Sequence, residues 1–328
     1  MTDHNWHWQE PETAWKGVGI YHVTLTVPSR EPLLGELIIP DNDPVKAYVE
    51  RHDLGKGVIH ALAQIPVRHP EVRLLQYCLM PDHMHAILYV SRTMDTSIRS
   101  VIRGFWQGVK KLGREQVLSI DPNSIRNNEQ NPLRGVNPLF TEQPFVRPLS
   151  RHGQLNAMMQ YVKLNPQRLA TKRLKPEFFY VQDNVDINGR IYSAVGNARI
   201  LTLARRSPVH VRHTMTEQAR LGDPQPLRDY MNGCVLDARK GTVMVSPFIS
   251  QYERDVLGVL INEQHPVIYL ANNGFGQYYK PSSLLFDAVD KGNMLILSPW
   301  EHDPSKKHVS RADCILLNKL AEEICRIS

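Results

Sequence analysis

Cysteine is scarce in this chain of 328 residues, and its four cysteines form no paired motif. Cys78, Cys234, Cys314 and Cys325 lie far apart, so the sequence lacks the CxxC pair that is typical of zinc sites. A chain of this length can bury a hydrophobic core without the help of disulfide bonds. We therefore expect reduced thiols, as in cytosolic proteins, and neither a disulfide framework nor a zinc site.

Long apolar runs are also missing. No segment approaches the roughly 20 consecutive apolar residues that a membrane helix requires. The first residues, "MTDHNWHWQEPETAWKG", contain no basic stretch followed by an apolar one, so they do not resemble a signal peptide. We expect a cytoplasmic protein without membrane segments, associated with the nucleoid if it binds DNA.

The chain has no acidic excess, and its net charge is +6. The charge is uneven, because residues 1–206 carry a net +7 and residues 207–328 carry −1. A basic surface attracts polyanions, which favours nucleic acid as a partner of the N-terminal part. An excess of this size also occurs in proteins without a charged partner, so the charge only supports this interpretation.

The N-terminal part alternates strand and helix patterns. Strands are expected at 21–27, 71–80, 83–91 and, with an interruption, 139–150. Helices are expected at 43–66, 95–117 and 151–170, the last of them broken or ended near Pro166. Asp95 or Thr96 is a plausible N-cap of the second helix. The order β-α-β-β-α-β predicts an α+β, ferredoxin-like antiparallel sheet with helices on one face and an extra helix appended.

The C-terminal part predicts a different architecture. Apolar strands at 241–250, 266–271 and 293–300 alternate with helices at 251–263, 281–292 and 311–325. This pattern predicts a parallel sheet covered on both faces, a small Rossmann-like α/β domain. The expected domains are a Trp-rich arm (1–18), a first globular domain (19–180), a linker (181–230) and the Rossmann-like domain (231–328).

Four residues of the C-terminal domain fall at predicted carboxyl ends of strands, where such sheets bind ligands: Ser246, Asn273, Gly274 and Gly276. The sequence contains neither GxGxxG after the first of these strands nor GxxxxGK[ST]. As turn residues, these four would need no ligand, and both explanations stay open.

Two histidines stand one residue apart in the apolar stretch "CLMPDHMHAIL". Because side chains alternate along a strand, His83 and His85 point to the same face, which suits a metal but equally suits two surface histidines. In the helix "MMQYVKLNPQR", Tyr161 and Asn165 are four residues apart and share a face. If that face lies over the strand, a divalent ion could polarise a phosphodiester and the phenol could attack phosphorus.

These two stretches resemble a known family. "YCLMPDHMHAILYV" resembles the His-hydrophobic-His (HUH) strand of Y1 transposases, which include the IS200-like and REP-associated tyrosine transposases. "QYVKLNPQRLA" resembles their catalytic helix, Tyr-x-x-x-Asn-Pro-x-Arg-Ala. The resemblance covers about residues 19–170, and both motifs occur in the family's order.

The resemblance implies an enzyme of DNA transposition and recombination. His83, His85 and Asn165 would bind Mg²⁺ or Mn²⁺, and Tyr161 would be the nucleophile. The protein would nick single-stranded hairpin or palindromic DNA and join strands through a covalent 5′-phosphotyrosine. One branch of the family forms dimers, so a homodimer is possible. Compact members end soon after the catalytic helix, whereas this chain continues with a domain that resembles DNA-processing-A-like or nucleotide-sensing domains.

Several alternatives stay open. Asp82, next to His83, could orient a metal ligand without binding the ion itself, or could be a simple turn residue. Tyr21 is a competing nucleophile, because relaxases place their tyrosine before the histidines, but it lacks a partner motif and suits core packing. A plasmid-type replication initiator would need a second tyrosine or a lysine beside the first, and Lys163 faces away from Tyr161. The protein could also be a catalytically silent DNA-binding regulator with a nucleotide-sensing C-terminal domain.

DNA contacts are expected on basic residues near the site. The helix at 95–117 carries a stripe that could track a phosphate backbone and stack a base, formed by Arg99, Arg103, Trp106, Lys110 and Arg114. Lys172 and Arg173 could hold the cleaved strand. Both sets could equally be solvated surface. The tryptophans Trp6, Trp8 and Trp15 could stack on bases or cap a sheet edge.

Overall fold

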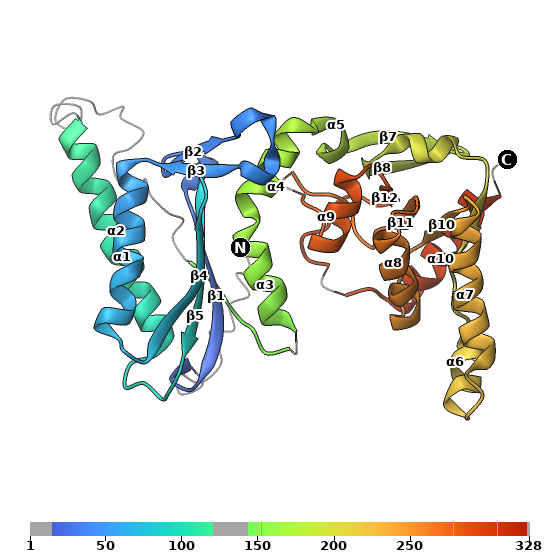
Figure 1. The fold of residues 1–328 in the computed structure, drawn as a ribbon, viewed down its shortest axis with the longest axis horizontal. Helices are drawn as coiled ribbons and strands as arrows, with labels where there is room; N and C mark the ends of the chain where they lie inside the picture. Colours follow the sequence, from blue (N-terminus) through green and yellow to red (C-terminus); the bar gives the residue numbers. More distant parts are fainter. Residues whose placement is uncertain (1–14, 121–143, 152, 278, 307, 327–328) are drawn as a thin grey trace. The chain divides into compact units, whose positions relative to one another are not determined.

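The computed structural model of the protein describes residues 15–120, 144–151, 153–277, 279–306 and 308–326. The chain folds as two compact units, Met1–Leu174 and Lys175–Ser328 (Figure 1). No helix in the described part of the chain combines the length and the apolar character needed to cross a membrane.

The first unit contains a four-stranded antiparallel sheet. Its strand order is β4-β5-β1-β6, with bounds Val72–Leu79 (β4), His83–Val90 (β5), Gly19–Thr26 (β1) and Phe145–Pro148 (β6). The strands predicted near residues 21, 71 and 83 are confirmed. Of the strand predicted over 139–150, residues 139–143 lie outside the described part of the chain, and β6 occupies four of the described residues. The turn of Met80, Pro81 and Asp82 joins β4 to β5 as the predicted hairpin.

The two faces of this sheet are covered by different helices. Tyr21, Val23 and Leu25 of β1 are buried in the core on one face, against α1 (Asp53–Arg68) and α2 (Ile98–Ile120). On the other face, Val162 of α3 (Gln154–Lys163) belongs to a cluster with Cys78 and Ile87. Figure 1 shows α1 and α2 side by side on one face of the sheet and α3 on the other. The appended helix therefore covers the face opposite to the expected pair.

The helix predicted over 43–66 is shorter at its start than expected. The Asp43 side chain accepts a hydrogen bond from Val45 N at 2.9 Å and caps a short 3-10 turn, η4 (Pro44–Lys46). The residues that follow form β3 (Tyr48–Arg51), which pairs with β2 (Gly35–Ile38) in a separate two-stranded sheet that the sequence did not predict. Pairing with the preceding strand therefore overrides the local helical pattern.

Two further helix details differ from the prediction. Pro66 lies inside α1, which continues to Arg68, so the missing N–H costs one bond near the helix end without stopping it. The helix α2 begins at Ile98, and Ser97 rather than Asp95 or Thr96 caps it, since Ser97 Oγ accepts from Ser100 N at 3.3 Å.

The second unit is built on a six-stranded sheet in the order β7-β8-β12-β11-β10-β9. The strands β9 to β12 run parallel, and β8 and β7 run antiparallel. Their bounds are Gln182–Ile187 (β7), Arg190–Gly196 (β8), Arg206–Pro208 (β9), Val243–Ser246 (β10), Val267–Leu270 (β11) and Met294–Ser298 (β12).

The segment 181–230 was predicted to be a linker, but it supplies the strands β7, β8 and β9 to this sheet. The turn between β7 and β8 is Asn188-Gly189, both with positive φ (56° and 75°). This dipeptide is the usual sequence of a tight hairpin, because both positions tolerate the left-handed region. The unit begins at Lys175, earlier than the expected start at 231.

Helices cover both faces of the second sheet, as predicted. Alternate strand residues such as Met244 and Ile296 face α7 (Gln225–Arg239), α8 (Gln251–Asn262) and α9 (Ser283–Asp290). Their neighbours Val245 and Leu297 face α10 (Arg311–Cys325). The remaining helices are η2 (Pro28–Arg30), η3 (Pro40–Asn42), α4 (Asn165–Leu174), α5 (Pro176–Phe179), η5 (Ala198–Thr202) and α6 (His213–Arg220).

Candidate active site

Three histidines lie on one face of the first sheet, the face that α3 covers. In the register of β1 against β5, Thr26 lies opposite His83 and Thr24 lies opposite His85. Because side chains alternate, His22 on β1 shares the face of both predicted ligands. His22 and His85 are buried, and 16% of the His83 side chain is exposed. The ring centroids of His83 and His85 are 4.9 Å apart with an interplanar angle of 82°.

Asp82 holds the ring of His83. Asp82 Oδ1 accepts from His83 Nδ1 at 2.5 Å, and Asp82 Oδ2 lies 3.3 Å from Arg30 Nη1. Burial raises the pKa of Asp82, but the hydrogen bond from His83 and the charges of His83 and Arg30 together lower the pKa below its ordinary value. The carboxylate is thus ionised and accepts only, which places the proton of His83 on Nδ1. Of the two roles considered for Asp82, this geometry matches that of an orienting residue.

His85 is held from β1. Its Nδ1 atom lies 3.1 Å from His22 Nε2 and 3.0 Å from Thr24 Oγ1. Burial, helped by the charge of Arg147, lowers the pKa of His22 to about 4, so His22 is neutral at ordinary pH. Sequence analysis missed His22 and Thr24. The alternation in "YHVTLT" puts them on one face, but only the register of β1 against β5 shows that His85 lies on it.

Tyr161 reaches this face from α3. Its ring centroid is 5.5 Å from that of His85, with an interplanar angle of 65°. The break expected near Pro166 is confirmed, since α3 ends at Lys163 and α4 starts at Asn165, so Tyr161 and Asn165 lie in successive helices. Pro166 explains the break, because it lacks the N–H that would bond to the Val162 carbonyl. Asn165 is buried at the start of α4, and Arg168 is buried with its guanidinium carbon 5.8 Å from the Tyr161 ring centroid.

The histidines fit a divalent metal ion in one respect that the sequence could not reveal. Both have Nδ1 engaged by an outer partner, which directs Nε2 toward any ion, as is usual for metal-binding histidines. In the part of the chain that the structure describes, no group of three His, Cys, Asp or Glu side chains could hold a metal. The set predicted from the sequence, two imidazoles and the Asn165 amide oxygen, would leave positions open for substrate.

The side chains of the predicted DNA-binding stripe on α2 differ in exposure and in their contacts. Arg103 is exposed. The Arg99 guanidinium carbon lies 5.5 Å from the Trp15 ring centroid, and Lys110 Nζ lies 3.5 Å from the Trp106 ring centroid. Trp106 is partly buried and packs against the core.

The other predicted DNA contacts differ in exposure. Lys172 is half-buried, and burial lowers the pKa of its amine, whereas Arg173 is exposed. The side chain of Arg114 lies outside the described residues, as do Trp6 and Trp8.

Trp15 and Tyr21 belong to the core on the face opposite to the histidines. Both are buried, and their rings stack with centroids 5.5 Å apart. Trp15 therefore packs inside the protein rather than on bases. Tyr21 points away from His83 and His85, which fits core packing and not the competing role of nucleophile.

The four residues predicted as a C-terminal ligand site have structural partners. Ser246 Oγ accepts from Phe248 N at 3.0 Å. Asn273 Oδ1 accepts from Asp303 N at 3.0 Å, and Asn273 Nδ2 donates to Asp303 O at 2.7 Å. A Cβ at Gly274 would lie 2.4 Å from His302 N, and one at Gly276 would lie 3.0 Å from His302 Nε2. Three of the four thus tie the loop after β11 to the loop after β12, as turn residues would.

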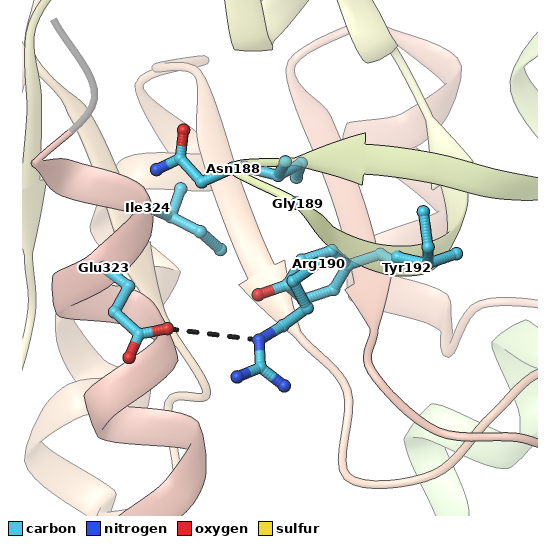
Figure 2. Close-up of a pocket in the computed structure, with 8 residues that line it drawn as sticks. Asn188, Gly189, Arg190, Tyr192, Glu323 and Ile324 are labelled. Carbon is cyan, nitrogen blue, oxygen red and sulfur yellow. Dashed lines mark ion pairs between the residues drawn. The ribbon is translucent and has the colours of Figure 1, made fainter.

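A pocket of about 470 Å³ lies elsewhere in this unit, between the β7–β8 turn and the end of α10 (Figure 2). Asn188, Gly189, Arg190 and Tyr192 line one side, and Glu323 and Ile324 line the other. Figure 2 shows Arg190 and Glu323 facing each other, with Arg190 Nε 4.0 Å from the Glu323 carboxylate. Burial raises the pKa of Tyr192 to about 12, so the phenol stays protonated. None of the predicted ligand residues lines this pocket.

Comparison with known proteins gives only distant likenesses. No family model matches the chain. A stretch of 76 residues, 23% of this chain, is 28% identical to an uncharacterized protein of Haemophilus influenzae and spans 38% of that protein's length.

Two solved structures are also similar to part of the chain. One is a REP-associated tyrosine transposase bound to a REP hairpin, with 12% identity and a TM-score of 0.30 over 46% of this chain and 68% of that one. The other is a putative transposase from Deinococcus radiodurans, with 17% identity and a TM-score of 0.28 over 44% and 89%. Likenesses at this level do not assign a family, so the function has to follow from the geometry of the site.

Proposed function

We propose that the first unit is a metal-dependent tyrosine transposase that nicks and rejoins single-stranded DNA, with hairpin or palindromic DNA as its substrate. One observation supports this function above the others: His83, His85 and Tyr161 lie together on one face of the sheet, and each histidine has its Nδ1 held by an outer partner.

The side chains of the site would have separate roles. Asp82 orients His83, while His22 and Thr24 contact His85, so the two Nε2 atoms and the Asn165 amide oxygen would hold a Mg²⁺ or Mn²⁺ ion. When bound, the ion would draw electron density from an oxygen of the scissile phosphate. Tyr161 Oη would attack the phosphorus as its proton leaves. The bond to the 3′ oxygen would break, that oxygen would take up a proton, and the 5′ phosphate would stay on Tyr161.

The joining step reverses the first one. A 3′-hydroxyl from a second strand end would attack the phosphotyrosine, lose its proton and release Tyr161 with its own proton restored. The phosphotyrosine conserves the energy of the broken linkage, so no external energy source is needed. A hairpin would present unpaired bases, which are cheaper to capture than stacked ones.

The charge of the first part of the chain suits this substrate. Residues 1–206 carry a net +7, and Arg103 and Arg173 are exposed. We assign the second, Rossmann-like unit a DNA-contacting or regulatory role. A homodimer, the state that the resemblance implies for one branch of the family, is a further proposal, and light scattering on the purified protein tests it.

Trapping the covalent adduct tests the catalytic proposal. Because Tyr161 would keep the 5′ phosphate, hairpin oligonucleotides from the DNA flanking the gene should carry their label at the 3′ end. After incubation with Mg²⁺ or Mn²⁺, a denaturing protein gel should show label at protein mass. The label should be absent with EDTA and with Tyr161→Phe, and present with Tyr21→Phe. Binding of the hairpins without any adduct, with both metals, would instead indicate the catalytically silent DNA-binding regulator.

A further inference from the structure

We propose that His22 is a positioning residue that accepts the Nδ1 proton of His85 and thereby keeps His85 Nε2 as the atom that binds metal. The inference concerns a histidine outside the HUH and tyrosine motifs, and it rests on the proposed function for the metal that His85 would hold.

The contact between His22 and His85 is buried. His22 Nε2 lies 3.1 Å from His85 Nδ1, and the two ring centroids are 5.1 Å apart. The exposed fractions are only 6% for His22 and 5% for His85. At this depth little water competes for the His85 Nδ1 proton, so a protein atom has to accept it.

The position of the partners decides which nitrogen can reach an ion. A neutral imidazole has one N–H and one lone pair, and a metal binds the lone pair. His22 and Thr24 both occupy the Nδ1 side of His85, so Nδ1 is not available to an ion and Nε2 would be the ligand atom. Nδ1 must then carry the proton and donate it. An imidazole nitrogen is a stronger acceptor than a hydroxyl oxygen, so His22 Nε2 is the main acceptor and Thr24 assists.

The two histidines of the site thus have matched partners of different charge. His83 has 16% of its side chain exposed and is paired with the carboxylate of Asp82. His85 is nearly inaccessible, and a carboxylate at the position of His22 would have to be buried as an ion, which is costly. A neutral imidazole supplies the acceptor without that cost.

The test uses three substitutions in the full-length protein. His22→Gln places an amide oxygen close to the position of Nε2, whereas the shorter His22→Asn does not reach it. His22→Leu keeps the volume and removes the acceptor. The exposed His60 on α1 lies on the far side of the sheet, so His60→Leu is the control for loss of a histidine. Thermal unfolding tests whether each variant is folded. If His22→Leu does not fold, the comparison of His22→Gln with His22→Asn tests the role of His22.

The first readout is the tautomer of His85 in the metal-free protein, from ring nitrogen resonances after ¹⁵N-histidine labelling, assigned with His85→Gln. Wild type and His22→Gln should carry the proton on Nδ1, and His22→Leu and His22→Asn should populate both tautomers. The second readout is Mn²⁺ affinity by electron paramagnetic resonance without DNA. It should fall about 10- to 100-fold in His22→Leu and His22→Asn, as for other outer-shell partners, and less in His22→Gln.

Either of two results would overturn the inference: a proton on Nε2 of His85 in the wild type, or an unchanged tautomer and Mn²⁺ affinity in both His22→Leu and His22→Asn. The tautomer readout needs neither metal nor DNA. If the tautomer of His85 responds to the His22 substitutions as expected while no DNA adduct forms, the positioning role of His22 is supported and the proposed nicking function is not.

Discussion

The ring of Tyr161 lies edge-on to the ring of His85, with centroids 5.5 Å apart, although the two residues come from a helix and a strand 76 positions apart in sequence. This contact places a phenol beside a candidate metal ligand, on the face of the sheet that also carries His83. Tyr21, on the same sheet, is buried on the opposite face. The two tyrosines therefore provide a matched pair for separating catalysis from packing.

Removing the Tyr161 hydroxyl should abolish adduct formation and leave the fold intact. Tyr161→Phe keeps the ring against His85, so the free energy of unfolding should change by no more than about 1 kcal/mol. Tyr21→Phe should form the adduct at the wild-type level. The adduct gel and chemical denaturation measure these effects, and an adduct of normal yield in Tyr161→Phe would exclude Tyr161 as the nucleophile.

Neutralising Asp82 should weaken metal binding without unfolding the protein. Asp82→Asn is nearly isosteric but loses the charge that holds His83 Nδ1 at 2.5 Å. Mn²⁺ affinity should fall about 10- to 100-fold, as for other outer-shell carboxylates. Asp53→Asn, at an exposed aspartate paired with Lys56 on the surface of α1, is the control and should bind Mn²⁺ normally. Equal Mn²⁺ affinity in the two variants would show that Asp82 is only a turn residue.

Gly274→Ala should destabilise the second unit. The added Cβ would lie 2.4 Å from His302 N and from the carbonyl carbon of Glu301, which are backbone atoms that cannot move aside cheaply. Overpacking of this kind costs about 1–3 kcal/mol. A Cβ added at Gly233 in α7 would enter open space, with no neighbour among the described residues within 4 Å. Gly233→Ala should therefore stabilise the helix by about 0.5–1 kcal/mol. Urea denaturation measures whether the free energy of unfolding falls in Gly274→Ala and rises in Gly233→Ala.

Glu263 should make the second unit sensitive to acid. Hydrogen bonds from Arg239 and His265 lower the pKa of Glu263 from 4.5 to about 2. A carboxyl whose pKa is lower in the folded state stabilises the fold above the unfolded pKa, and this contribution is lost as the pH falls from about 4.5 toward 2. Glu263→Gln should therefore flatten the dependence of the unfolding midpoint on pH in that window. An unchanged slope would contradict the role of the Arg239 and His265 contacts.

The local sequence was sufficient to predict several structural features of this protein. The alternation of a strand places His83 and His85 on one face, because successive side chains in extended backbone must point to opposite sides. The helix predicted at 311–325 has those bounds in the structure, since Ser310 and Asp313 form a capping box just before an amphipathic run. In both cases the determining contacts lie within a few residues of each other.

Other features of the fold and of the candidate site depend on tertiary contacts alone. His22 and Thr24 meet His85 across more than 60 residues, through a register between β1 and β5 that no local pattern states. The strands of the segment 181–230 form because β8 and β9 find partners in β12 and β10, far along the chain. The partial burial of Trp106 against the core likewise depends on contacts with residues elsewhere in the chain. Register, burial and strand partnership are properties of distant contacts, so only the folded chain fixes which side chains surround the candidate active site.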